Sequence, residues 1–321
     1  MRTATKAAQV ARLPLQMDLF AGLEEAAATT AEVLPFPKTS AAAAVEATIK
    51  RRNARNFVIG NELADIGDPE RKFADNVAAI RLLQKLSEEG RPATEKEKRV
   101  LVRYTGWGGL PQAFDMTDSC AKPHWREEFK ALLSREDWEA ARASVNNAHY
   151  TDPVVVRFIW ATLKRIGFAG GRIIEPAAGI GHFLGCMPQD IAAVSDLHAV
   201  EIDRISAQIL RTLYPDAVVH ARGFEKVAFP SGSFDLAISN VPFGKYRLSD
   251  PKYDRLKLSV HDYFFAKSLD LVRPGGIVAF VTSHFTVNGG GEGTWPSPPF
   301  FSSCAVANGT QATPASSSRL G

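Results

Sequence analysis

Cysteine is scarce in this sequence of 321 residues: only Cys120, Cys186 and Cys304 occur, and they are far apart in the chain. No two of them have the short spacing of metal ligands, and three isolated thiols do not form a disulfide framework. We therefore expect no metal site and no disulfide. A reducing, cytoplasmic setting follows as the default expectation.

Long apolar runs are also missing. No stretch reaches the length that a membrane-spanning helix needs without including charged residues. No continuous apolar region follows Arg2 and Lys6 near the N-terminus, which argues against a secretory signal. The formal net charge of +3 is too small to indicate nucleic-acid binding by itself, whereas 45% apolar and 23% charged residues are ordinary for a globular enzyme.

The composition changes along the chain and divides it into four segments. Residues 1–48 are rich in Ala, Thr and Glu, which predicts a disordered leader. Residues 49–148 carry apolar residues at helical spacing and predict a helical extension. Residues 149–286 alternate between strand and helix patterns and predict the main domain.

The last segment, residues 287–321, consists mostly of Gly, Ser, Thr, Pro and Ala, and its only charges are Glu292 and Arg319. It has no periodic apolar pattern, so we expect disorder. Because a buried type of strand ends just before it, we expect that the reading frame is truncated or shifted after about residue 286. An ordinary flexible tail is the alternative.

The main domain has the sequence pattern of an α/β protein. Strands are predicted at residues 172–175, 198–202, 217–220, 234–239 and 276–282, and helices at 153–166, 183–187, 204–213 and 262–272. Strands separated by helices predict βαβ units and a mostly parallel, doubly wound, Rossmann-like sheet. Ligands of such sheets bind beyond the carboxyl ends of the strands.

A glycine loop follows the first predicted strand, with Gly179 and Gly181 at its centre. Glycine lets the backbone turn tightly and approach a ligand. Because His182 and Phe183 follow where a nicotinamide fingerprint has its third glycine, we do not expect a pyrophosphate. Glu201 ends the next strand, about twenty residues on, where an acid accepts the ribose hydroxyl protons. The pattern favours a nucleoside cofactor, with a glycine turn in an unrelated α/β protein as the alternative.

The segment Asn240-Val241-Pro242-Phe243 follows another predicted strand and should lie at the same edge of the sheet. An exocyclic amine is a weak nucleophile because its lone pair is delocalised into the ring. The side-chain oxygen of Asn240 and the carbonyl of Val241 could accept both amine protons and localise that lone pair. Pro242 stiffens the loop, and Phe243 offers a face for stacking a base.

The order of these motifs resembles the S-adenosylmethionine-dependent DNA adenine-N6 methyltransferases, whose cofactor motif precedes a catalytic N-P-P-Y/F loop. Val241 replaces the first proline of that loop. The resemblance implies S-adenosylmethionine as cofactor, DNA as partner and Asn240–Phe243 as catalytic residues. It also implies cofactor contacts for Tyr150, Thr151, Glu175, Pro176, Gly179, Gly181, Glu201, Phe224 and Glu225. The acid of the Phe224 segment is displaced by one residue from the family's pattern.

More closely, the chain resembles the methyltransferase region of large plasmid- and phage-borne proteins that fuse this domain to a helicase. The loss of sequence after Val287 implies that the last strands of the sheet are missing at its C-terminal edge. Two alternatives stay open. One is methylation of a glutamine amide in protein or a guanine amine in RNA, and the other is a non-catalytic, DNA-associated module of a mobile element.

Two further segments indicate partners. Lys245 and Arg247 form a basic stretch beside the catalytic loop that could hold DNA phosphates, with a solvated charged face as the alternative. Gln16, Leu19 and Phe20 belong to a segment that resembles the peptide by which proteins bind the bacterial sliding clamp. The alternative for this segment is an amphipathic patch or a helix that docks on its own domain.

Overall fold

The structure is a computed structural model, and it describes residues 53–64, 67–117, 122–145, 150–244, 246–282 and 304–308. The chain separates into two compact units, Met1–Pro35 and Phe36–Gly321, and all the described residues belong to the second. The predicted disordered leader, residues 1–48, lies outside the described residues.

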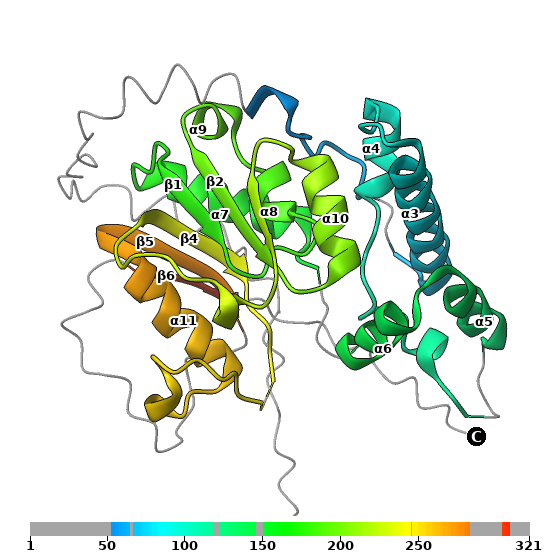
Figure 1. Cartoon of the computed structure of the whole chain (residues 1–321). Helices are drawn as coiled ribbons and strands as arrows, with labels where there is room; N and C mark the ends of the chain where they lie inside the picture. Colours follow the sequence, from blue (N-terminus) through cyan, green and yellow to red (C-terminus); the bar gives the residue numbers. More distant parts are fainter. Residues whose placement is uncertain are drawn as a thin grey trace, which may run out of the picture. The chain divides into compact units, whose positions relative to one another are not determined.

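A parallel sheet forms the centre of the described region (Figure 1). Its strands are β1 (Arg172–Glu175), β2 (Asp196–Glu201), β3 (Val218–Ala221), β4 (Phe234–Asn240), β5 (Val272–Thr282) and β6 (Cys304–Asn308). They lie side by side in the order β3-β2-β1-β4-β5-β6, and every neighbouring pair is parallel. The prediction of a Rossmann-like α/β sheet is confirmed, because this is the strand order of doubly wound folds.

Successive residues of β1 and β4 face opposite sides of the sheet and enter two separate hydrophobic cores. Ile173 belongs to one core and its neighbour Ile174 to the other. Leu236 and Ala237 divide between the same two cores. Strands buried on both faces explain why these segments read as continuous apolar runs in the sequence.

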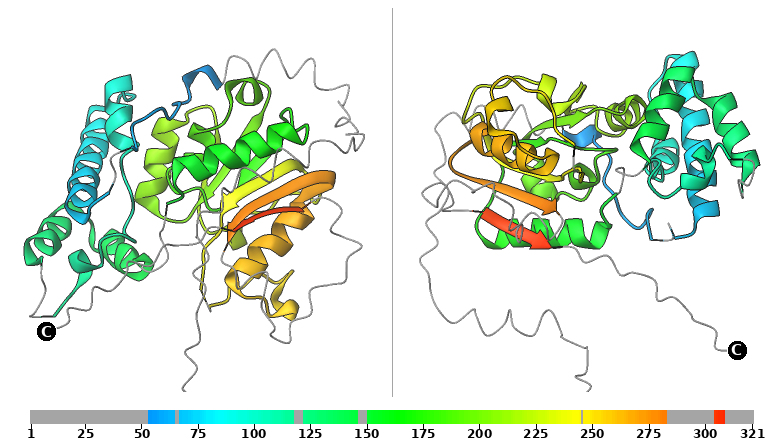
Figure 2. Two further views of the ribbon diagram at one scale, coloured as in Figure 1. Left: turned by 180° about the vertical axis from the view of Figure 1, so that it is seen from behind. Right: turned by 90° about the horizontal axis from the view of Figure 1, so that it is seen from below.

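Helices cover both faces of the sheet, which lies between α7 and α11 in the right-hand view of Figure 2. The helices of the main domain are α7 (Pro153–Arg165), α8 (His182–Gly185), α9 (Gln189–Ala192), α10 (Arg204–Leu213) and α11 (Val260–Leu271). Asp152 and Asp203 begin α7 and α10, because their carboxylates accept the N–H groups of Val154 and Ser206. The structure thus confirms the alternation of strands and helices.

The edge of the sheet after β4 differs from the sequence prediction. β5 begins at Val272, four residues before the predicted start at Gly276, and its pairing with β4 shifts register between Phe234 and Leu236. A local shift of this kind is invisible to a pattern of alternating residues. β6 lies within the segment for which the sequence predicted no regular structure, and it pairs with β5 from residue 304 to residue 308. The outer N–H and C=O groups of β5 provide the ladder for this pairing.

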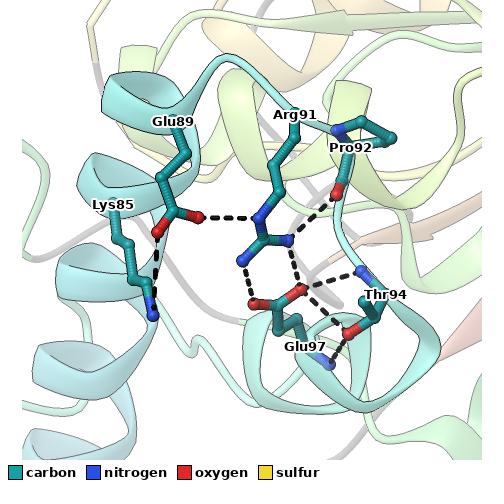
Figure 3. Close-up of polar contacts among 6 residues, drawn as sticks. All are labelled: Lys85, Glu89, Arg91, Pro92, Thr94 and Glu97. Carbon is teal, nitrogen blue, oxygen red and sulfur yellow. Dashed lines mark hydrogen bonds and ion pairs between the residues drawn. The ribbon is translucent and has the colours of Figure 1, made fainter.

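Helices also occupy the described chain before the sheet. They are α3 (Pro69–Glu89), α4 (Glu95–Leu101), α5 (Pro123–Leu132) and α6 (Arg135–Ser144), with 3-10 turns at Asn53–Arg55 and Pro111–Phe114. Figure 3 shows how α3 joins α4: the guanidinium of Arg91 donates to the carboxylates of Glu89 and Glu97. Thr94 and Glu97 form a reciprocal capping box that starts α4.

This helical region and the sheet share a hydrophobic core, and polar contacts join them as well. The backbone N–H of Phe57 donates to the carbonyl of Leu213 at 2.8 Å, and Arg55 pairs with Asp216 in the loop after α10. Arg204, the first residue of α10, pairs with Asp137 of α6. The helices before the sheet therefore pack directly on the α10 side of the main domain, and a domain boundary near residue 148 stays a prediction.

None of the described helices combines the length and the apolar character that crossing a membrane requires. No group of three or more His, Cys, Asp or Glu side chains in the described part of the chain is placed to hold a metal ion.

Candidate functional site

A cavity of about 470 Å³ lies at the carboxyl ends of β1, β2 and β4. Its size falls within the range of about 300–1,000 Å³ that is typical of small-molecule sites. The predicted site residues that line it are Tyr150, Thr151, Glu175, Pro176, Gly179, Glu201, Phe224, Glu225, Asn240, Val241, Pro242 and Phe243. Segments more than 90 residues apart in the sequence thus meet at one cavity, where ligands bind in parallel sheets.

Three neighbouring strands each end in a polar residue at this cavity. Glu201 is the last residue of β2, Glu175 the last of β1 and Asn240 the last of β4, and these strands are adjacent in the sheet. Parallel strands bring their carboxyl ends to one edge, so the three side chains face the same space. Two carboxyl groups and one amide are therefore the principal polar side chains at the strand ends.

Glu201 fixes the glycine loop to the end of β2. One carboxylate oxygen accepts the N–H of Gly179 at 2.6 Å, and the other accepts the N–H of Asp203 at 2.7 Å. Burial and, to a smaller extent, the nearby charge of Asp203 raise the pKa of Glu201 to about 7, although the backbone hydrogen bonds to its carboxylate oppose this rise. Each oxygen keeps a second lone pair, so the carboxylate can accept two more hydrogen bonds from a ligand while it holds the loop.

The two glycines of the loop have different roles. Gly179 has φ +56° and lines the cavity. The ring of Tyr150 packs against it, because a Cβ atom added to Gly179 would lie 2.7 Å from Cε1 of Tyr150. Gly181, with φ +86°, does not line the cavity, and a Cβ atom there would lie 2.5 Å from Cε2 of Tyr214 and 2.6 Å from Cδ1 of Leu210. The structure therefore does not place Gly181 at the ligand, and its lack of a side chain lets the loop pack on α10.

Glu175 has a different environment from Glu201. It is 1% exposed, and no donor among the described residues reaches its Oε2 atom. Burial raises the pKa of Glu175 well above its ordinary value, with a further contribution from the charge of Glu201. A buried carboxyl group without a donor is costly when it is ionised, so a ligand with positive charge or several N–H donors would stabilise it.

Two more polar groups at the cavity have no hydrogen-bond partner among the described residues. These are Oγ1 of Thr151 and Nε2 of His182, and both residues line the cavity. Nδ1 of His182 lies 3.2 Å from the carbonyl oxygen of Thr151, and burial lowers the pKa of His182 to about 4. The imidazole is therefore neutral near pH 7, donates from Nδ1 and presents Nε2 as an acceptor.

Aromatic side chains form another part of the cavity wall. Phe224 packs against Phe264 with ring centroids 5.1 Å apart, and both residues line the cavity. Lys267 of α11 holds this wall from behind, because its Nζ donates to the carbonyl of Phe224 at 2.8 Å and to Asp250 at 3.0 Å. Tyr263 donates to the same Asp250 oxygen at 2.7 Å. This buried network was not predicted from the sequence, since a lone lysine in an apolar helix carries no motif.

The segment after β4 is anchored to the sheet on both sides. The N–H of Val241 donates to the carbonyl of Val281 at 3.2 Å, and Oγ of Ser239 donates to the carbonyl of Ala177 at 3.2 Å. Val241 is buried and belongs to the core under α11. These contacts fix the start of the predicted catalytic loop against the glycine loop and β5.

The described residues before the sheet also contribute to the cavity, which the sequence did not predict. Gly106 and Trp107 line it, as do Ala140, Ala143 and Ser144 of α6. The segment around Trp107 is rich in glycine and carries aromatic residues. Only its packing against the main domain shows that it forms a wall of the site.

The remaining predicted residues do not reach this cavity or cannot be placed. Arg247 lines a second cavity of about 250 Å³ together with Tyr253 and Lys257. Lys245 lies outside the described residues, as do the residues of the predicted clamp-binding segment, Gln16, Leu19 and Phe20. A contact with a sliding clamp stays a prediction.

Comparisons with known proteins give the following likenesses. No protein-family model matches the sequence. The chain is 28% identical over 219 residues, 67% of its length, to the protein named "Defense against restriction protein B" of Escherichia phage P1, and the match covers only 8% of that protein. A Listeria monocytogenes protein described as a class I S-adenosylmethionine-dependent methyltransferase is 14% identical, with a TM-score of 0.38 over 68% of this chain and 75% of that chain. The methyltransferase subunit of a type I restriction-modification system from Streptococcus thermophilus is 15% identical, with a TM-score of 0.36 over 65% of this chain and 56% of that chain.

Proposed function

We propose that the protein transfers a methyl group from S-adenosylmethionine to the N6 amine of adenine in DNA. The observation that carries this proposal is the convergence of Glu175, Glu201 and Asn240 at one cavity from three adjacent parallel strands. The first two offer acceptors for a cationic nucleoside cofactor. The third offers an acceptor for the amine that receives the methyl group.

The side chains around Glu175 fit the methionine end of the cofactor. S-adenosylmethionine carries an ammonium group and a sulfonium group, so it needs acceptors and negative charge. Oε2 of Glu175 and Nε2 of His182 have no partner among the described residues and can serve as those acceptors. Oγ1 of Thr151 also has no partner among the described residues. It can accept a hydrogen bond from the ammonium group or donate one to the carboxylate of the cofactor.

The residues at the other end fit the nucleoside. Glu201 has lone pairs left for the ribose hydroxyls after it accepts the N–H groups of Gly179 and Asp203. Gly179 lacks the side chain that would otherwise fill the approach to the loop. Phe224 supplies a buried ring for an adenine face, held in place by Lys267. Glu225 lines the cavity beside it and is the weaker candidate for a contact.

The segment after β4 performs the chemical step in this proposal. When bound, the cofactor supplies an electrophilic methyl group on a positively charged sulfur. The amide oxygen of Asn240 and the carbonyl oxygen of Val241 accept hydrogen bonds from the two N–H groups of the target amine. These hydrogen bonds localise the lone pair on the amine nitrogen. Phe243 stacks on the base, and Pro242 limits the movement of the loop during transfer. The amine loses one proton to water after it is methylated, so no dedicated base is needed.

DNA is proposed as the substrate because the N-V-P-F loop resembles that of DNA adenine methyltransferases. The phage relative is named for defense against restriction, and restriction acts on DNA, which supports the same class of substrate. That the chain corresponds to part of a larger helicase fusion stays a prediction.

The proposal is tested by transfer of a radiolabelled methyl group from S-adenosylmethionine to unmethylated duplex DNA, RNA and protein. Label should appear in DNA, and digestion to nucleosides should place it on N6-methyladenine. The Asn240→Ala variant, purified in the same way, should transfer no label above background. Label in RNA guanine or in protein glutamine would replace the proposal with one of those activities. Cofactor binding without transfer to any substrate would favour a non-catalytic module.

A further inference from the structure

The ring of Tyr150 lies between two glycines from different parts of the chain. A Cβ atom on Gly106 would lie 2.8 Å from Cε2 of the ring, and one on Gly179 would lie 2.7 Å from Cε1. Cε1 and Cε2 are on opposite edges of the ring, so one glycine borders each edge. Both glycines have left-handed backbone conformations, φ +65° and φ +56°, that side-chain-bearing residues rarely adopt. The ring therefore couples the loop at Gly106 to the glycine loop.

The space between Gly106 and Gly179, which holds the Tyr150 ring, is called the slot below. Asn76 of α3 fixes the Gly106 side of this slot. Its Nδ2 donates to the carbonyl of Gly106 at 2.7 Å, and its Oδ1 accepts the N–H of Thr105 at 2.8 Å. Asn76 is completely buried, and a buried amide is costly unless it is hydrogen-bonded. Since both ends of this amide bond to Thr105 and Gly106, its evident role is to fix that turn.

The neighbouring residue holds the same loop from its other end. Asp75 accepts from Nε and Nη2 of Arg103 at 3.0 and 2.8 Å, and Nη1 of Arg103 donates to the carbonyl of Glu62 at 2.6 Å. Asp75 and Asn76 thus fix residues 103–106 through consecutive positions of α3. The turn at Gly106 is therefore firmly anchored, although its sequence is rich in glycine.

The far side of the slot connects directly to the proposed cofactor site. The hydroxyl of Tyr150 lies 3.3 Å from Oγ of Ser206 in the first turn of α10. Gly179 donates its N–H to Glu201. Tyr150, Gly106 and Gly179 all line the cavity. A displacement of the ring would therefore move the segment that carries the proposed ribose contact.

We propose that Asn76 and Gly106 are positioning residues for the cofactor: they hold the Tyr150 ring, and the ring sets the position of the glycine loop at Gly179. The inference rests on the proposed function and deepens it, because it makes the helices before the sheet part of the cofactor site. It assigns these helices a role in cofactor affinity in addition to their role in the shared core.

The test uses Gly106→Ala in the full chain, with Gly109→Ala as the matched control from the same loop. A Cβ atom on Gly109 would meet the flexible side chain of Lys72, at 3.0 Å from its Cδ, and Gly109 does not line the cavity. Calorimetric titration with S-adenosylmethionine should show about tenfold weaker binding for Gly106→Ala and a change within about twofold for Gly109→Ala. Equal affinity of Gly106→Ala and the wild type would overturn the inference.

A double-mutant cycle separates positioning from a general loss of stability. In a Tyr150→Leu background there is no ring edge for the new methyl group to displace, so Gly106→Ala should cause no further loss of affinity. Additive losses, with the same tenfold effect in both backgrounds, would contradict coupling through the ring. If Gly106→Ala does not fold, Asn76→Ala serves in its place, with about threefold weaker binding expected and the same cycle applied.

A second measurement does not depend on the cofactor. Amide hydrogen exchange of residues 176–183 in the ligand-free protein should be faster in Gly106→Ala or Asn76→Ala than in the wild type, and unchanged in Gly109→Ala. Unchanged exchange in both of the first two variants would refute the inference. If the wild type does not bind S-adenosylmethionine, the proposed cofactor fails, and the exchange data alone decide whether Asn76 and Gly106 position the glycine loop.

Discussion

At the ends of β1 and β2 the cavity is walled by two buried carboxyl groups and a glycine loop, whereas beyond β4 it is walled by an amide and aromatic rings. On the first side, burial raises the pKa of both Glu175 and Glu201, and the charge of Glu201 raises the pKa of Glu175 further. On the second side, Asn240 ends β4 and Phe243 lies just beyond it, and the end of β4 is anchored to β5. The first side is thus suited to a positively charged ligand, and the second to a flat base with an exocyclic amine.

This difference gives the two sides separable roles in the proposed reaction. Groups that contact the cofactor throughout catalysis contribute to its binding, whereas groups that contact the reacting amine contribute mainly in the transition state. Substitutions on the first side should therefore change cofactor affinity, and those on the second side should change turnover. The following predictions test this separation, from the largest expected effect to the smallest.

The largest effect is expected on the second side, for Asn240→Ala. Removal of the amide leaves one acceptor, the carbonyl of Val241, for the two amine protons. We expect turnover to fall by roughly a thousandfold, comparable to the loss of a donor in an oxyanion hole. The dissociation constant for S-adenosylmethionine, measured by calorimetry, should stay within about twofold of the wild type. A large loss of cofactor affinity in this variant would show that the two sides are not separable.

On the first side, Glu201→Ala should weaken cofactor binding by about 10- to 100-fold, which corresponds to roughly 1–3 kcal/mol. The variant loses the acceptor for the ribose and also leaves the N–H groups of Gly179 and Asp203 without their partner. Glu225→Gln is the matched control, because Glu225 also lines the cavity but lies in the 3-10 turn at Phe224–Lys226 and not at the end of a strand. Equal affinity of Glu201→Ala and the wild type would remove Glu201 from the cofactor site.

The pH dependence of stability should distinguish Glu175 from an ordinary carboxyl group. Its pKa in the folded protein is raised above the ordinary 4.5, so the folded state keeps a proton that the unfolded chain has released. Stability should therefore fall as pH rises above about 4.5, and Glu201 adds to this fall up to its pKa of about 7. Urea denaturation between pH 5 and pH 8 measures this slope.

The Glu175→Gln variant cannot ionise and should flatten that slope. At pH 8 we expect it to be about 1–2 kcal/mol more stable than the wild type without cofactor, because the Gln side chain does not have to take up a proton when the chain folds. The same variant should bind S-adenosylmethionine more weakly, since the counter-charge is lost. A variant that is less stable than the wild type at every pH would contradict this account of Glu175.

The smallest effect is expected for Arg247→Ala. Arg247 lines the second cavity, which adjoins the proposed target-base side of the first cavity through the shared residue Leu248. If Arg247 contacts a phosphate, DNA binding should weaken about equally for all sequences, and the slope of the logarithm of affinity against the logarithm of salt concentration should fall by about 1. Cofactor affinity should not change. An unchanged salt slope in a fluorescence anisotropy titration would favour a solvated surface role.

The residues that end the strands were predictable, whereas most of the groups that position them were not. Glu175 and Glu201 each terminate an apolar run, and such a run followed by an acid is a local pattern that sequence reasoning detects. The inward packing of Gly181 could not be predicted, because it depends on Tyr214 and Leu210 in another helix. Lys267 was missed for the same reason, since its partners Phe224 and Asp250 are 43 and 17 positions away.

The sequence by itself determined the alternation of strands and helices, because the spacing of apolar residues and the N-terminal caps at Asp152 and Asp203 act locally. Only the tertiary structure decided which parts of the chain enclose the cavity. The turn at Gly106 comes from the helices before the sheet, and it reaches Tyr150 and Gly179 because the two regions share a core. Contacts of this kind join residues far apart in the chain, and no local pattern records them.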